Sequence, residues 1–208
     1  KLLLSGANSY KGNTSIGGGT IQLGNASGIP GGSGNGDVNM GTNTILDLNG
    51  FSPVLDALNA SAAPATIDNV SGGGAVTLTI GENGDYGTFF GSIKNTSGTL
   101  ALVKDGAGTE SLTGTNTYAG GTTINAGILS IGNGNTNASA GLGTGPVVIN
   151  ASGTLQFNTG GTNTFTNSVS GSGALNVANL NATLNLAGNN SGFTGPINVN
   201  AGVLWITN

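Results

Sequence analysis

Single aliphatic residues alternate with polar residues in many short stretches of this sequence. In residues 75–80, AVTLTI, Val76, Leu78 and Ile80 would share one face of a strand, with threonines on the other face. A period of two is typical of a strand with one buried face, and no stretch shows a convincing helical period. The same alternation recurs at Ile21/Leu23, Leu46/Leu48, Leu155/Phe157, Leu175/Val177 and Leu184/Leu186. The pattern therefore predicts an all-β chain; only residues 53–62, PVLDALNASA, fit a helical turn as well as an irregular strand.

A longer motif occurs three times. Residues 4–25, LSGANSYKGNTSIGGGTIQLGN, align without gaps to residues 112–133, LTGTNTYAGGTTINAGILSIGN, and residues 186–208 form a third copy with one inserted residue. Each copy is predicted to form a strand, a turn and a strand. Two equivalent positions stand out in the three copies: Tyr10, Tyr118 and Phe193 at one, and Gly19, Gly127 and Gly202 at the other.

Repeats of this kind predict a stacked architecture. A short strand with two or three inward aliphatic residues cannot bury its face alone, so such repeats gain a core by stacking on their neighbours. Asn-Gly and Gly-Gly pairs between the strands supply the positive φ angles of tight corners. With roughly 20–25 residues per coil, about eight to ten coils would form one parallel β-helix across residues 1–208. A Greek-key sandwich is the alternative, but it would leave the sequence repeat unexplained.

Composition removes several classes of function. Glycine accounts for 41 of the 208 residues, charged residues for 6%, and the net charge is −4. The four lysines and the absence of arginine argue against nucleic-acid binding, which requires many phosphate contacts. There is no histidine or cysteine, so the usual general base and the thiolate metal ligands are missing. No apolar run is long enough to span a membrane as a helix, and we expect no cofactor.

The middle copy also resembles a known family. Residues 98–133, GTLALVKDGAGTESLTGTNTYAGGTTINAGILSIGN, resemble the autotransporter-associated β-strand repeat found in passenger regions of Gram-negative autotransporter-type surface proteins. Residues 142–157 and 46–58 are similar to the strands between that family's repeats. The resemblance implies a right-handed parallel β-helix that is exported to the cell exterior. It implies a structural role, or a role in export and folding, and it brings no catalytic residue.

The carboxylates are the first candidates for chemistry. The alternative of a polysaccharide-active enzyme would need two carboxylates at a defined separation. The pairs that are close in sequence, Glu82 with Asp85 and Asp105 with Glu110, lie in glycine-rich corners, and we interpret them as solvated turn residues. Residues 31–39, GGSGNGDVN, resemble a calcium-binding nonapeptide. However, Asp37 is one position late and the motif occurs once, so we expect no metal site there.

Glu110 is the acid that poses a question. It aligns with Leu2 and Leu184, which are both predicted to point inward. A buried, unpaired carboxylate would be costly, and Lys104 is the nearest partner in sequence. We favour the interpretation that the strand begins one residue later, which leaves Glu110 at a hydrated corner. If Glu110 instead points inward, Glu110→Leu is expected to stabilise the fold.

Trp205 is the candidate binding residue. In residues 203–206, VLWI, Leu204 and Ile206 are predicted to point inward and Trp205 outward, where an indole can stack on a sugar or a protein partner. Neither end of the chain has a charged or amphipathic cap, and uncapped strand edges template further pairing. We therefore expect further β-helix repeats, or identical copies stacked end to end.

These observations predict a non-enzymatic structural rod or fibre of an exported cell-surface protein of a Gram-negative-type bacterium. The first alternative is an adhesin or glycan-binding module that uses an outward face near Trp205, with surface glycans or cell-surface proteins as partners. The second is a polysaccharide-active β-helix enzyme.

Overall fold

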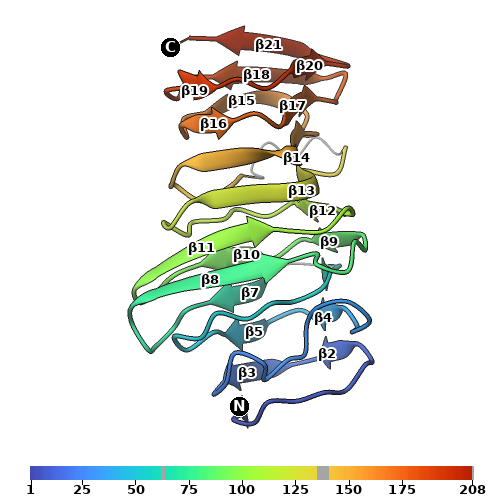
Figure 1. Ribbon diagram of the computed structural model, residues 1–208, viewed down its shortest axis with the longest axis vertical. Coiled ribbons are helices and arrows are strands. Elements are labelled where there is room, and N and C mark those ends of the chain that lie inside the picture. The colour runs from blue at the N-terminus through green and yellow to red at the C-terminus, as the bar shows by residue number, and fades with distance from the viewer. Residues whose placement is uncertain (62–63, 135–140, 208) are drawn as a thin grey trace.

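The computed structural model describes residues 1–61, 64–134 and 141–207, and in these residues the regular structure is entirely β. The chain climbs from the N-terminus at one end of the molecule to the C-terminus at the other, in about nine coils (Figure 1). Every strand pair formed by the described residues is parallel, which confirms the parallel β-helix and makes the Greek-key alternative wrong. Among the described residues, no helix is long and apolar enough to cross a membrane.

Each coil passes three faces in turn. The first face holds β1 (Leu2–Leu4), β3 (Gly19–Leu23), β5 (Thr44–Asp47), β7 (Ala65–Asp68) and β10 (Ser92–Lys94), and further along the rod β15 (Gly161–Phe165), β18 (Ala182–Leu186) and β21 (Val203–Ile206). The second holds β8 (Ala75–Ile80), β11 (Thr99–Lys104), the first parts of β13 (Thr122–Ile131) and β14 (Val147–Phe157), β16 (Val169–Gly171) and β19 (Gly192–Phe193). The third holds β2 (Thr14–Ile16), β4 (Val38–Met40), β6 (Leu58–Ala60), β9 (Gly87–Phe89), β12 (Thr109–Leu112), the last parts of β13 and β14, β17 (Ala174–Val177) and β20 (Ile197–Val199).

The interior is a continuous stack of aliphatic side chains. Val76, Leu78 and Ile80 of β8 are buried, and at most 2% of the surface of each residue is exposed. The threonines between them are half-exposed. Each coil places its inward residues over those of the coil before it, so burial of apolar surface is shared between neighbours and stabilises the whole stack. The alternation in the sequence therefore predicted the core correctly.

Residues 53–61 form an irregular strand and no helix. Val54 makes an isolated parallel bridge to Thr79, and β6 follows. Asp56 and Ala57 between them are fully buried. Of the segment that the sequence left open, residue 62 lies outside the described residues.

Each copy of the repeat closes one coil upon itself. Its first strand pairs with its last: β1 with β3, β12 with the end of β13, and β18 with β21. The corresponding partners are Leu4 with Leu23, Leu112 with Ile131, and Leu186 with Ile206. The sequence repeat is thus one structural rung.

The equivalent glycines have the same backbone conformation. Gly19, Gly127 and Gly202 have φ angles of 75°, 65° and 82°, the left-handed region in which a side chain is unfavourable. Gly127 lies where β13 turns from the second face to the third, beside a register shift between Ile124 and Ala126. This position therefore needs glycine because the strand must bend there without losing its neighbours.

The equivalent aromatic position is locked to the strand that follows. The Tyr10 hydroxyl lies 2.6 Å from Thr14 Oγ1, and the Tyr118 hydroxyl lies 2.7 Å from Thr122 Oγ1. Tyr118 is fully buried, and burial raises its pKa to about 12. Both tyrosines hold the turn against the strand four residues later.

Candidate functional site

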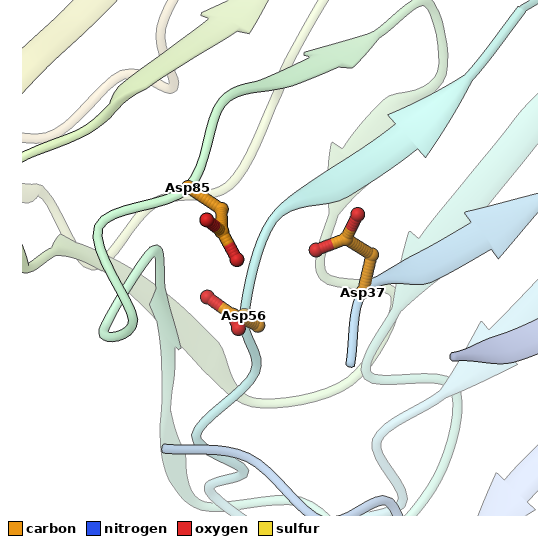
Figure 2. Close-up of side chains that lie close together, drawn as sticks. All are labelled: Asp37, Asp56 and Asp85. Atoms are coloured by element: carbon orange, nitrogen blue, oxygen red, sulfur yellow. The ribbon is translucent and has the colours of Figure 1, made fainter. Parts of the chain in front are cut away.

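Carboxylates from three successive coils meet where the chain turns into the third face. Asp37 directly precedes β4, while Asp56 and Asp85 each stand two residues before the next strands of that face, β6 and β9. The strands stack in parallel register, β4 on β6 and β6 on β9, so the residues that precede them stack as well. One carboxylate oxygen from each aspartate lies within 4.8 Å of the other two (Figure 2). We call these three residues the acidic corner.

The hydrogen bonds of the acidic corner leave one oxygen without a partner. Asp56 is fully buried, and its Oδ1 accepts a hydrogen bond from the Asn83 backbone amide at 3.1 Å. Its Oδ2 is also buried and accepts none. The Asn83 side-chain amide donates to the exposed Asp85 at 3.2 Å. The half-buried Asp37 accepts a long bond of 3.4 Å from Asn59.

The negative charge of the acidic corner is poorly compensated. Burial raises the pKa of Asp56, and repulsion from Asp85 and Asp37 raises it further against the opposing hydrogen bonds. Burial and repulsion from Asp85 likewise raise the pKa of Asp37. Among the described residues, no lysine forms a salt bridge with these three carboxylates. The hydrogen bonds of the acidic corner therefore offset its negative charge only in part.

Glu110 is buried beneath this corner, so the preferred interpretation of a hydrated position was wrong. Only 1% of the residue is exposed. Its side chain passes through space that Gly87 leaves empty, because a Cβ on Gly87 would collide with Glu110 Oε2. Oε2 accepts a hydrogen bond of 3.1 Å from the Leu58 amide, two coils away, whereas Oε1 is buried without a partner. The Glu110 side chain thereby passes the neighbouring coil, which contains Gly87, and contacts the coil beyond it, which contains Leu58.

The surroundings of Glu110 favour its protonated form. Burial is the largest cause that raises the pKa of Glu110 to about 8. The hydrogen bond from Leu58 and the charge of Lys104 oppose this rise, while Asp37 and Asp56 add to it. A carboxyl group at this position is therefore largely neutral in the folded protein at pH 7.

Lys104, the expected partner of Glu110, is held by carbonyl groups. It is fully buried, and its Nζ donates to the carbonyl oxygens of Asp105 at 2.5 Å, Gly106 at 2.9 Å and Ala126 at 3.3 Å. Burial lowers its pKa, against the attraction of Glu110 and Asp105. Lys104 thus acts on Glu110 through its charge, while its hydrogen bonds close the corner between β11 and β12.

The acidic corner does not suit a glycosidase. Such an enzyme must place two accessible carboxylates on either side of a glycosidic bond. Asp56 is fully buried, so a sugar ring cannot enter between it and Asp85. Of the pairs that are close in sequence, Glu82 and Asp85 are both exposed, whereas Asp105 is half-buried and Glu110 is buried.

Trp205 lies on the outer surface of the first face. It is 61% exposed and pairs in register with Asn185 of β18, while its neighbour Leu204 packs on the core. The outward orientation is as predicted. Tyr86 is a second exposed aromatic residue, 78% exposed, and it follows Asp85 directly at the acidic corner.

By its fold, the chain is a parallel β-helix assembled from self-closing coils. Residues 1–23, 102–131 and 181–206 match the Passenger-associated-transport-repeat family. These segments overlap the three copies found in the sequence, and they confirm the resemblance to autotransporter passenger repeats.

A protein that is similar to the chain is also named an autotransporter. Over 130 residues, 62% of the chain, it is 40% identical to "Adhesin BmaC autotransporter" of Brucella suis biovar 1 (strain 1330). The chain spans 4% of that relative's length. No solved structure matches the chain.

Proposed function

We propose that this chain is a rod segment of a passenger region exported to the surface of a Gram-negative bacterium, where it holds other parts of the protein away from the cell. The observation that carries the proposal is the closure of each passenger repeat into one coil of a parallel stack. Backbone hydrogen bonds along three faces make such a stack stiff. Few segments can open locally, so the rod should also resist proteases.

Apolar residues at both ends of the rod support a longer stack. Leu2 on β1, which pairs with the buried Ile21, is 55% exposed, and Val199 and Ile206 in the last coil are 48% and 54% exposed. Ile206 lies directly over the buried Leu186, so it continues the interior column. A further coil at each end, from the same polypeptide or from a second copy, would cover these side chains.

The purified chain tests the rod function directly. About nine coils at roughly 4.8 Å each give a rod on the order of 43 Å long. We expect small-angle X-ray scattering to give an elongated particle of that length, or electron microscopy to show its filaments, and we expect no saturable binding to eukaryotic cells or glycans. Saturable binding by the isolated chain would reject the passive rod and favour an adhesive module.

The second candidate function is glycan binding through Trp205, which its 61% exposure favours. If an outward indole stacks on sugars, Trp205→Ala should abolish binding on a glycan array, since aromatic stacking dominates such contacts. The matched control is Tyr86→Ala, which removes an exposed aromatic residue elsewhere on the rod. A wild-type protein that binds no glycan, or a Trp205→Ala protein that binds as well as wild type, would rule out this role.

A further inference from the structure

We propose that Asp37, Asp56 and Asp85 bind one Ca²⁺ ion that joins three successive coils of the rod (Figure 2). The proposal goes beyond the rod function and does not depend on it.

The separation of the carboxylates fits one calcium ion. Calcium binds oxygen ligands at about 2.3–2.6 Å, so two oxygens on opposite sides of the ion are roughly 4.6–5.2 Å apart. The three aspartate oxygens all lie within 4.8 Å of one another. In Figure 2 the carboxylates of Asp56 and Asp85 face each other, and that of Asp37 approaches from the neighbouring coil. Oxygens this close together can contact a single ion.

A buried oxygen without a partner points independently to a ligand. Asp56 is fully buried, and its Oδ2 accepts no hydrogen bond. A buried carboxylate oxygen in this condition loses its hydration without compensation, which is costly. A cation beside Oδ2 would remove that cost. The backbone amide of Asn83 already holds the other oxygen of the same carboxylate, so the group is oriented before the ion binds.

The chemistry of the acidic corner favours calcium over other metals. Every candidate ligand is a carboxylate oxygen, the type that calcium and magnesium prefer. Magnesium requires a near-ideal octahedron at about 2.0–2.1 Å, whereas calcium accepts irregular sets of six to eight oxygens. Three aspartates from three coils form an irregular set. Because Asp85 is exposed, water can complete the coordination shell and the ion has a route of entry.

The site would act as a clamp between coils. Asp37 belongs to the turn before β4, Asp56 to the turn before β6, and Asp85 to the turn before β9. An ion held by all three ties these coils together, in addition to the hydrogen bond of 3.1 Å that the Gly34 amide donates to Asn83 Oδ1 from the first coil to the third. Local opening of this part of the rod would then require release of the ion, so calcium should raise the stability of the folded chain.

The test uses the chain after treatment with a chelator. Isothermal titration with CaCl₂ should show one ion bound per chain, with a dissociation constant on the order of 10⁻⁴–10⁻³ M, the range of extracellular calcium modules. The unfolding temperature should rise with CaCl₂. Asp56→Asn keeps an acceptor for the Asn83 amide but removes the charge, and it should weaken calcium binding about tenfold or more. With chelator present, this variant should unfold at or above the wild-type temperature, because it relieves the repulsion.

The control variant is Glu82→Gln, which removes the same charge from the same turn without touching the three ligands. It should bind calcium as the wild type does. If Asp56→Asn fails to fold, the exposed Asp85→Asn serves in its place and should weaken binding in the same way. The proposal is overturned if neither heat nor a change in unfolding temperature appears up to about 10 mM CaCl₂, or if Glu82→Gln weakens binding as much as Asp56→Asn. Equal affinity for MgCl₂ would reject calcium as the specific ion.

Discussion

Replacing Gly127 by alanine is expected to lower the free energy of unfolding by about 4 kcal/mol or more, which is an exceptional loss for one methyl group. Gly127 has a φ angle of 65°, where any side chain costs about 1–2 kcal/mol. In addition, the new Cβ would collide with the Gly108 carbonyl oxygen and lie 2.6 Å from that of Gly106. Both are backbone atoms of the coil below, so relief would require the ladder between β12 and β13 to separate. Urea unfolding monitored by circular dichroism measures this loss.

Gly19→Ala is the matched control, because Gly19 occupies the equivalent position of the first copy. Its φ angle is 75°, but an added Cβ would meet no atom within 4 Å. We expect this variant to lose only the conformational cost of about 1–2 kcal/mol. Equal losses for the two variants would show that backbone conformation alone explains the glycine, and that the close approach of the lower coil does not.

Glu110→Gln is expected to remove most of a pH dependence that the wild type should show between pH 5 and pH 8. The folded protein holds a proton on Glu110 up to a pKa of about 8, while the unfolded chain releases it near 4.5. The unfolded state therefore binds fewer protons across this range, so the stability of the wild type falls as the pH rises. The fall is on the order of 3 kcal/mol between pH 5 and pH 8. Glutamine cannot ionise and should give a flatter profile.

The order of stability of the wild type and Glu110→Gln should also reverse between pH 5 and pH 8. At pH 5 Glu110 is neutral in the folded protein, so its burial carries no charge penalty. The side-chain NH₂ group of glutamine would need a hydrogen-bond acceptor in the same buried space, so the wild type should be at least as stable as the variant. At pH 8 the variant should be the more stable protein. Glutamine keeps an oxygen for the Leu58 amide, which leucine would not, so Gln tests the charge more cleanly than Leu.

Unfolding by urea at several pH values, in the presence of chelator, measures the profile of Glu110→Gln. The exposed Glu82→Gln should keep the slope of the wild type. A wild-type free energy of unfolding that is constant from pH 5 to pH 8 would contradict a buried, protonated Glu110. So would parallel profiles for the wild type and Glu110→Gln.

The sequence predicted the fold because the fold is encoded locally. The alternation at Val76, Leu78 and Ile80 is visible within six residues, and the three copies of the repeat are visible by comparison of the chain with itself. The equivalence of Gly19 and Gly127 in the sequence also carried over to their backbone conformation. Inward and outward positions follow from the strand period alone, whatever lies in the next coil.

The acidic corner could not be found in this way. Asp37, Asp56 and Asp85 belong to coils of unequal length, so the residue that lies above another depends on the pairing register, which periodicity does not fix. The hints in the sequence are that each aspartate stands one or two residues before a strand, and that residues 31–39, which contain Asp37, resemble a calcium-binding nonapeptide. Glu110 was misjudged for the same reason. The space that receives it is left by Gly87, a residue of the coil below that no local pattern connects with it.

The closure of each repeat into a single coil has a consequence for how such proteins can change. Because the first strand of a copy pairs with its own last strand, a duplicated or lost copy alters the number of rungs and leaves a matching surface on either side. Recombination between the gene segments that encode such copies would then change the length of the rod in steps of one rung.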